Sequence, residues 1–267
     1  MSECENIKLN ISVEDILTVE KETRSQAKGI SFFLHRAGRI GASVCHSAYN
    51  TSQAQPSISL IKTICYPKLF SFSTEATKYG CKHEKNAIQA FLKQMSCHQN
   101  FKIEQCGVYI NKEFPYLHAT PDFIYSCDCC EETGCGEVKC PFCLYNTNIN
   151  EYVNNKNSCL IYTSDGKLSL SKNHPYYFQV QQQLFTLNKQ FCYFIVFGTD
   201  ESNSITLFYE KINKRSDHWD SVLPKLHFFW SFCILPEILA RWYTRKGHLL
   251  NTGECENIQY SGTHVFV

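Results

Sequence analysis

The sequence predicts an α/β fold in which helices flank a mixed central β-sheet. Residues 191–198 (FCYFIVFG) carry the strongest strand pattern of the chain. Residues 73–95 carry the clearest amphipathic helix, with apolar residues recurring at helical spacing. Helix, strands, helix, strand and helix follow one another in that order, which is typical of a sheet covered by helices.

The other expected elements are read from caps, turns and apolar periodicity. We expect helices at 12–24, 42–49, 175–187 and 217–244, and strands at 103–111, 116–126, 136–140, 159–163, 167–170 and 205–211. Pro224 and Pro236 are expected to kink the last helix. No linker divides the 267 residues, so we expect a single domain over 1–267, with a helical lead-in (1–29), a catalytic core (30–212) and a helical C-terminal extension (213–267).

Composition excludes several classes of protein. Hydrophobic residues make up 43% of the chain and aromatic residues 14%, well above a disordered protein. No signal-peptide pattern begins the chain, and the apolar runs are short of a membrane span. We therefore expect an intracellular protein, nuclear or cytoplasmic, that neither is secreted nor crosses a membrane. In that setting the 16 cysteines are expected to be reduced or to bind metal rather than to form disulfides.

Basic residues are concentrated in one part of a nearly neutral chain. The net charge is +1, yet residues 21–85 contain ten Lys or Arg and three acids. Such a stretch is typical of a local phosphate-binding surface. An ordinary solvated face is the alternative on charge alone.

Two carboxylates and a lysine form the most informative pattern. Asp122 opens a short apolar strand within LHATPDFIY, and Glu137 and Lys139 follow 15 and 17 residues later within GCGEVKCP. Residues two apart in a strand share one face, so Glu137 and Lys139 project together. If the strands pair, Asp122 joins them. Converging carboxylates favour a bound divalent cation, although the Glu/Lys pair alone also fits an ordinary surface strand.

A third carboxylate strengthens this interpretation. Glu84 shares the apolar stripe of the 73–95 helix with Ile88, Phe91 and Met95. A carboxylate on a buried face needs a basic partner or a metal. Three acids and one lysine in the same cleft favour the metal.

These residues fall within a series of motifs that resembles a known family. RAGRIGAS, YGCKHE, ATPD, GEVKCP and YYFQVQQQL occur in the order found in the lambda exonuclease and YqaJ-like viral recombinase group of the PD-(D/E)XK nuclease superfamily. The resemblance covers residues 30–200. It implies a restriction-endonuclease-like core that cuts DNA with Mg²⁺ or Mn²⁺, often as a 5′-to-3′ exonuclease on duplex ends.

The resemblance also implies roles for individual residues. Asp122 and Glu137 match the metal carboxylates, with the Val138 carbonyl as a further ligand, and Glu84 matches the helix glutamate beside the metal. Lys139 matches the lysine that positions the attacking water.

Two further groups of residues are implied by the same resemblance. Gln179 and Gln181 match a Q-x-Q motif, the first next to the catalytic centre and the second grouped here with the DNA contacts. Arg36 and Ser43 resemble the pair that holds a 5′-terminal phosphate, with Arg39 beside them; arginine forks onto phosphate oxygens. The family's Thr-Ala-Ser reads Gly41-Ala42-Ser43 here, which removes one hydroxyl from that pocket.

Cysteines crowd the segment that joins Asp122 to Glu137. Cys127, Cys129, Cys130 and Cys135 lie within nine residues, without the paired C-x2-C spacing of zinc ribbons. A structural Zn²⁺ that braces the catalytic strands and reduced, unliganded thiols are both compatible with this spacing.

The function most consistent with these features is a Mg²⁺-dependent DNA nuclease in recombination, repair or the processing of viral or mobile-element DNA. The alternatives are a catalytically idle DNA-binding or assembly module, and a nuclease of different substrate, an endonuclease or one acting on RNA. The set of Glu84, Asp122, Glu137 and Lys139 argues against the idle module. A homo-oligomer such as a trimer and a recombination partner protein are also expected.

Overall fold

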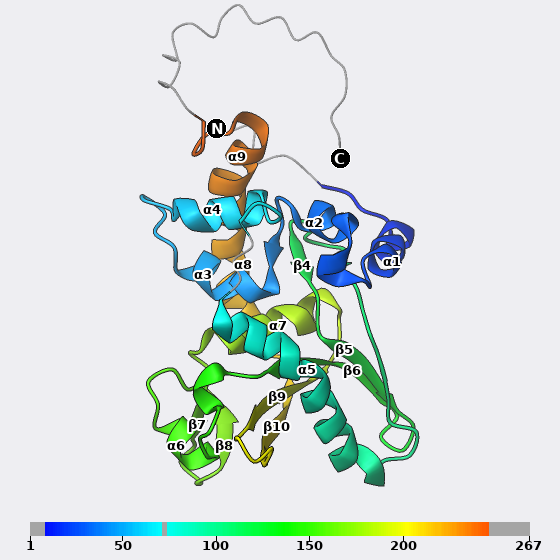
Figure 1. Ribbon diagram of the computed structural model, residues 1–267. Coiled ribbons are helices and arrows are strands. Elements are labelled where there is room, and N and C mark those ends of the chain that lie inside the picture. Colours follow the sequence, from blue (N-terminus) through cyan, green and yellow to red (C-terminus); the bar gives the residue numbers. More distant parts are fainter. Residues whose placement is uncertain (1–8, 71–73, 246–267) are drawn as a thin grey trace, which may run out of the picture.

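The computed structural model describes residues 9–70 and 74–245 (Figure 1). Its main sheet has five strands in the order β10-β9-β6-β5-β2, in which β6 and β9 are parallel and all other neighbours are antiparallel. The strands are β2 (Lys102–Glu104), β5 (Phe123–Cys127), β6 (Glu132–Lys139), β9 (Phe191–Thr199) and β10 (Ile205–Asn213). The mixed central sheet expected from the sequence is confirmed.

Helices cover both faces of this sheet, and strand β9 shows how. Its side chains alternate, and Tyr193, Ile195 and Phe197 pack with helix α5 (Glu75–Gln94). Cys192, Phe194 and Val196 pack with helix α7 (Pro175–Thr186) on the opposite face. Both faces of a strand buried between helix layers must be apolar, which explains the unbroken hydrophobic run at 191–198.

A second group of elements lies above the main sheet in Figure 1, around a short sheet of order β1-β4-β3. Trp219, Leu226 and Trp230 belong to its core, with residues of β1, α3 and α4. The remaining elements are α1 (Val13–Glu22), η2 (Gln26–Lys28), α2 (Ile30–Arg36), β1 (Ile40–Gly41), η3 (Ala42–Val44), α3 (Cys45–Asn50), α4 (Ile58–Cys65), η4 (Met95–Cys97), β3 (Tyr109–Ile110), β4 (Leu117–Ala119), η5 (Phe142–Leu144), α6 (Ile149–Val153), the hairpin β7 (Leu160–Tyr162) and β8 (Leu168–Leu170), α8 (Ser216–Phe229), η6 (Trp230–Ile234) and α9 (Leu235–Ala240).

The strands expected at 103–111 and 116–126 are each divided in two. In the first, the backbone leaves the main sheet at Gly107, whose N–H donates to Glu20 Oε1 at 3.0 Å, and Val108 N–H donates to Thr23 Oγ1 at 2.7 Å. A Cβ atom on Gly107 would lie 2.0 Å from the Glu20 carbonyl oxygen, so only glycine allows this crossing. In the second, Pro121 lies between β4 and β5, and Asp122 stands at this break.

The last helix is expected to kink at Pro224 and at Pro236, but only the region before Pro236 is irregular. Pro224 lies within the uninterrupted α8, whereas a π-helical turn, Trp230–Ile234, comes just before Pro236. Within the described residues the stretch Ser216–Ala240 is long and apolar enough to cross a membrane by length and composition, but half of its most apolar window is buried in the fold. The ends of the expected lead-in (1–8) and C-terminal extension (246–267) lie outside the described residues.

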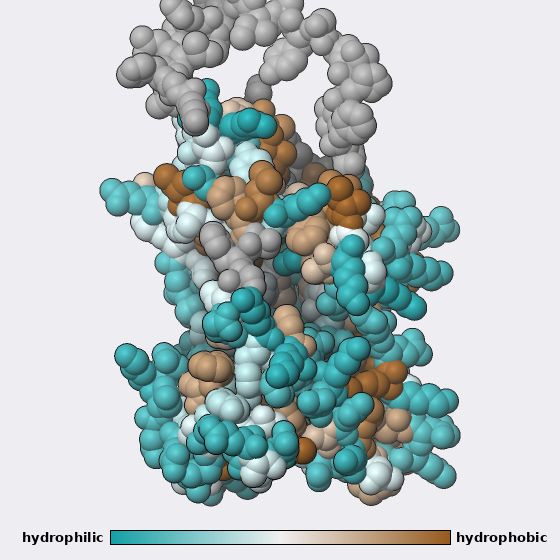
Figure 2. Space-filling view, in the orientation of Figure 1, coloured by the Kyte–Doolittle hydropathy of each residue, from teal (hydrophilic) through white to brown (hydrophobic). Residues whose placement is uncertain are grey.

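The hydropathy of the surface in Figure 2 differs between the two groups of elements. Apolar side chains gather on the upper part, over α2, α4 and α9, whereas the lower part around the main sheet is mainly hydrophilic. The exposed large apolar residues of those helices are Ile30, Leu34, Ile58, Ile238 and Leu239.

Candidate active site

The β5–β6 hairpin brings Asp122, Glu137 and Lys139 together as their spacing predicts. Asp122 N–H donates to Gly136 O at 3.0 Å, and Asp122 Oδ2 accepts from Val138 N–H at 2.6 Å. Lys139 Nζ lies 2.6 Å from Glu137 Oε1. Val138 points the other way, into the core beneath α5. Alternation along β6 therefore places Glu137 and Lys139 on one face of the strand and Val138 on the face that packs against α5.

Glu137 is held by two glutamines of α7. Its side chain is 3% exposed, and Gln179 Nε2 donates to Oε1 at 2.6 Å while Gln183 Nε2 donates to Oε2 at 2.5 Å. A buried carboxylate with charge-assisted hydrogen bonds on both oxygens keeps one orientation. Gln183 is a site residue that the sequence interpretation missed. Its i+4 spacing from Gln179 was the available signal.

The sheet face and helix α5 enclose one cleft of about 360 Å³. Glu84 of α5, Asp122, Glu137, the Val138 backbone, Lys139 and Tyr176 of α7 line it. Lys139 Nζ also lies 4.5 Å from the centre of the Tyr176 ring, so a cation–π contact holds the ammonium in place. The three acids and the lysine that the sequence grouped together do share one cavity.

The charges in this cleft do not balance. Burial and the neighbouring Glu137 carboxylate raise the pKa of Asp122 well above its ordinary value of 3.8, and the same two causes raise the pKa of Glu84 above 4.5. Burial opposes the charge of Lys139, but Glu137 and Asp122 outweigh it and raise the pKa of the ammonium. Three carboxylates thus face a single lysine.

This donor set fits a hard divalent cation. Carboxylate and carbonyl oxygens are the ligands that Mg²⁺ and Mn²⁺ prefer. A cation with two positive charges would offset both the burial of these carboxylates and their repulsion by Glu137, which together raise the pKa of Asp122 and Glu84. Asp122, Glu137, Glu84 and the Val138 carbonyl are the residues that would hold it.

A second pocket lies beside β1 and is lined by Arg36, Arg39, Ser43 and His118. Arg36 Nε and His118 Nδ1 are buried without a hydrogen-bond partner in the part of the chain that the structure describes. Arg39 is partly engaged, because it donates to Pro115 O and His35 O, each at 3.0 Å. Buried polar atoms without partners indicate a ligand site, and a pocket with two guanidinium groups suits an anion.

His118 explains why glycine stands at position 41. A Cβ atom on Gly41 would lie 2.7 Å from His118 Nε2, so the imidazole fills the space that a side chain at position 41 would need. Burial, followed by Arg36 and Arg39, lowers the pKa of His118 well below 6.5. A neutral imidazole still carries one N–H donor. His118 was not among the residues singled out from the sequence.

We expect Gly41→Thr to destabilise the protein by about 1–3 kcal/mol, the usual cost of overpacking a buried site. In the double variant Gly41→Thr/His118→Ala the clash is absent, so the two changes should cost less together than the sum of the single variants. Urea unfolding of the four proteins measures this coupling. Strictly additive costs would contradict the proposed contact.

Two residues expected in functional sites lie elsewhere. The Gln181 side chain is buried and engaged at both ends, since it donates to Asn213 O at 2.9 Å and accepts from Arg215 N–H at 2.9 Å. The Gln181 side chain therefore links α7 to the end of β10 by hydrogen bonds, and it lines neither pocket. Cys135 is fully buried in the core beneath α7, opposite Cys192. The expectation that Cys135 shares a metal with the other hairpin cysteines is wrong.

Asp122→Asn is expected to stabilise the metal-free protein. A carboxyl group whose pKa is higher in the folded chain than in the unfolded chain lowers stability as the pH rises above the unfolded value. Asparagine can still accept from Val138 N–H and carries no charge. We expect a Tm increase of roughly 2–4 °C, about 1 kcal/mol in a chain of this size, and a larger increase at pH 8 than at pH 5. Thermal unfolding in chelator at both pH values measures it, and an unchanged or lower Tm would contradict the account.

The fold, with Asp122 before β5 and Glu137, Val138 and Lys139 at the end of β6, has the arrangement of the PD-(D/E)XK core that the sequence resemblance implies. The chain belongs to the YqaJ-like viral recombinase family, whose model matches residues 31–190. The resemblance seen in the sequence is thereby confirmed. No curated protein matches the chain in sequence.

Solved structures share the fold at low sequence identity. An alkaline exonuclease (LHK-Exo) from Laribacter hongkongensis is 18% identical with a TM-score of 0.55, covering 80% of this chain and 97% of its own. SOX in a complex with DNA is 12% identical with a TM-score of 0.60, covering 85% and 72%. SOX of KSHV in a complex with RNA is 12% identical with a TM-score of 0.58, covering 84% and 75%.

Proposed function

We propose that this protein is a metal-dependent DNA nuclease that hydrolyses phosphodiester bonds. The convergence of Glu84, Asp122, Glu137 and Lys139 in one cleft carries the proposal, because three partly or fully buried carboxylates beside one lysine favour a site that takes a cation. A protein that merely binds DNA gains nothing from it. Family membership and the exonuclease fold support the same conclusion.

In this proposal the residues of the cleft have different roles in hydrolysis. A bound Mg²⁺ would polarise the phosphate and favour deprotonation of the attacking water. Gln179 and Gln183 keep Glu137 in a single orientation. Lys139, held between Glu137 and the Tyr176 ring, places its ammonium where it can orient the water and balance developing negative charge.

We also propose that the protein acts on duplex ends as a 5′-to-3′ exonuclease. Arg36, Ser43 and His118 would bind the 5′-terminal phosphate, with the imidazole N–H in place of the missing threonine hydroxyl. The supporting observation is that helix α7 contacts both the end pocket and the catalytic cleft. Gln182 donates to Ile40 O and to His118 O, at 2.8 and 3.0 Å, from the same helix whose Gln179 and Gln183 hold Glu137. One rigid helix therefore fixes the distance between end pocket and catalytic cleft.

Three substrates test this proposal directly. With Mg²⁺, we expect a linear duplex bearing 5′-phosphates to be degraded to mononucleotides, a covalently closed circle to stay intact, and RNA to be cut at least tenfold more slowly. Nicking of closed circles would contradict an exonuclease. Preferred cleavage of RNA would favour the second candidate, for which the fold shared with SOX bound to RNA is the one supporting observation.

The wider role follows from that chemistry. End resection is a step in recombination, repair and the processing of viral or mobile-element DNA, so an intracellular site of action, nuclear or cytoplasmic, is part of the proposal. A homo-oligomer such as a trimer and a recombination partner protein remain predictions.

A further inference from the structure

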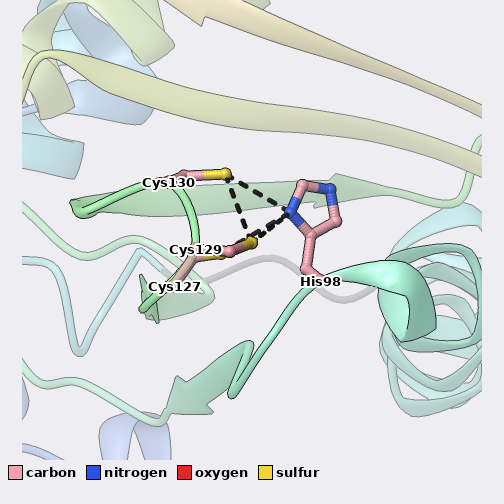
Figure 3. Close-up of side chains that lie close together, drawn as sticks. All are labelled: His98, Cys127, Cys129 and Cys130. Atoms are coloured by element: carbon pink, nitrogen blue, oxygen red, sulfur yellow. Dashed lines mark hydrogen bonds between the residues drawn. The ribbon is translucent and has the colours of Figure 1, made fainter.

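We propose that His98, Cys127, Cys129 and Cys130 form a structural zinc site at the end of the main sheet remote from the catalytic cleft. Their four ligand atoms all lie within 4.8 Å of one another. Figure 3 shows the His98 ring, which follows η4, with its Nδ1 turned toward the sulfurs of the β5–β6 turn. The site rests on this geometry alone and stands whether or not the chain is a nuclease.

Five of the six distances between the ligand atoms are close to those of a tetrahedral zinc centre, and the sixth, between the Cys127 and Cys130 sulfurs, is within 4.8 Å. Bonds of about 2.3 Å to sulfur and about 2.0–2.1 Å to nitrogen place neighbouring ligand atoms roughly 3.5–3.8 Å apart. Here the Cys127–Cys129 and Cys129–Cys130 sulfurs are 3.4 and 3.9 Å apart. His98 Nδ1 lies 3.5, 3.5 and 3.3 Å from the sulfurs of Cys127, Cys129 and Cys130.

Other bonding explains this cluster poorly. A disulfide needs sulfurs about 2.05 Å apart, much closer than 3.4 Å. Nδ1 of a histidine offers either one N–H or one lone pair, so it can form a hydrogen bond with only one thiol at a time. Three sulfurs at nearly equal distance from one nitrogen therefore indicate a cation between them.

The surrounding contacts hold the ligands in place. Gln99 N–H donates to Cys129 Sγ at 3.4 Å, as expected beside a negatively charged thiolate. Asp128 N–H donates to Gln99 O at 3.1 Å, and Asn100 Nδ2 donates to Asp128 Oδ2 at 2.7 Å. Hydrogen bonds thus join the segment after η4, residues 98–100, to the β5–β6 turn that carries the cysteines.

The position of the site indicates its role. Asp122 directly precedes β5 and Cys127 is its last residue, so the two lie roughly 17 Å apart if the backbone between them is extended. Zinc at Cys127 would therefore not touch the reacting groups. It would tie the end of α5, which carries Glu84, to the hairpin that carries Asp122 and Glu137. A metal that joins these elements stabilises the relative placement of the carboxylates.

The metal content of the full-length protein tests the proposal. We expect about one zinc ion per chain by mass spectrometry after dialysis, and less than about a tenth of that in His98→Ala and Cys129→Ser. Cys97→Ser is the matched control, because Cys97 is an exposed cysteine next to His98 whose sulfur points to Gln94 O. It and Asp122→Ala should keep their zinc.

Cobalt substitution keeps the test decisive if a variant fails to fold. The wild-type protein loaded with Co²⁺ should show the intense visible absorption of a tetrahedral thiolate site and return to colourless with excess Zn²⁺. Folded wild-type protein without zinc and without that absorption would overturn the proposal. So would a disulfide among Cys127, Cys129 and Cys130 in protein purified under reducing conditions.

Discussion

Lys139→Ala is expected to slow DNA cleavage about 10³-fold, within the range usual for loss of a group that handles protons at the reacting atoms. Lys139 contacts Glu137 Oε1 at 2.6 Å and faces the cleft, so it acts where the water must be oriented. Because it is not one of the expected metal ligands, binding of DNA and of Mg²⁺ should persist. Single-turnover rates at saturating enzyme, with a separate DNA Kd in Ca²⁺, distinguish these effects.

The control for this variant is Lys167→Ala, which also removes a lysine paired with a carboxylate. The Lys167–Asp165 pair is highly exposed, and such pairs contribute little to stability. It should cut DNA at the wild-type rate. A Lys139→Ala protein that is folded and cuts within tenfold of wild type would show that the lysine is structural.

Arg36→Ala is expected to remove the preference for a 5′-phosphate. A lost charge-assisted hydrogen bond costs about 1.5–3 kcal/mol, so the rate on 5′-phosphorylated ends should fall roughly 10–100-fold. The rate on ends with a 5′-hydroxyl should change little, because that substrate lacks the phosphate that Arg36 is proposed to bind. Initial rates on the two duplexes, differing only in the terminal phosphate, give the ratio.

Arg215→Ala serves as the matched control, since Arg215 is an exposed arginine in an ion pair with Asp217. It should retain the wild-type ratio between the two ends. An equal loss on both ends in Arg36→Ala would indicate a general DNA contact or a folding defect in place of end recognition.

The geometry of the β5–β6 hairpin could be predicted from the sequence, because it depends mainly on the spacing of residues within single strands and helices. The period of a strand puts Glu137 and Lys139 on one face, and helical spacing puts Glu84 on a buried stripe. Each expectation required only that the segment be correctly identified as a strand or as a helix. The pairing of β5 with β6 then brought in Asp122, which stands at the break that Pro121 makes.

Residues that depend on tertiary contacts escaped this reasoning. His98 lies 29 residues before Cys127, and only the packing of α5 on the sheet brings its ring to the hairpin turn. Cys135 is a cysteine only five residues after Cys130, but its position in β6 places its side chain in the core. Likewise, the contact of His118 with Gly41 depends on the parallel pairing of β1 with β4.

The most direct test of the central claim is metal-dependent cleavage of an end-labelled duplex by the wild-type protein and Asp122→Ala. We expect no product in chelator, a rate that rises with Mg²⁺ and saturates, and a loss of at least about 10³-fold in the variant. Cleavage that continues in chelator, or an Asp122→Ala protein that cuts as fast as wild type, would contradict the assignment of this cleft as a metal-dependent active site.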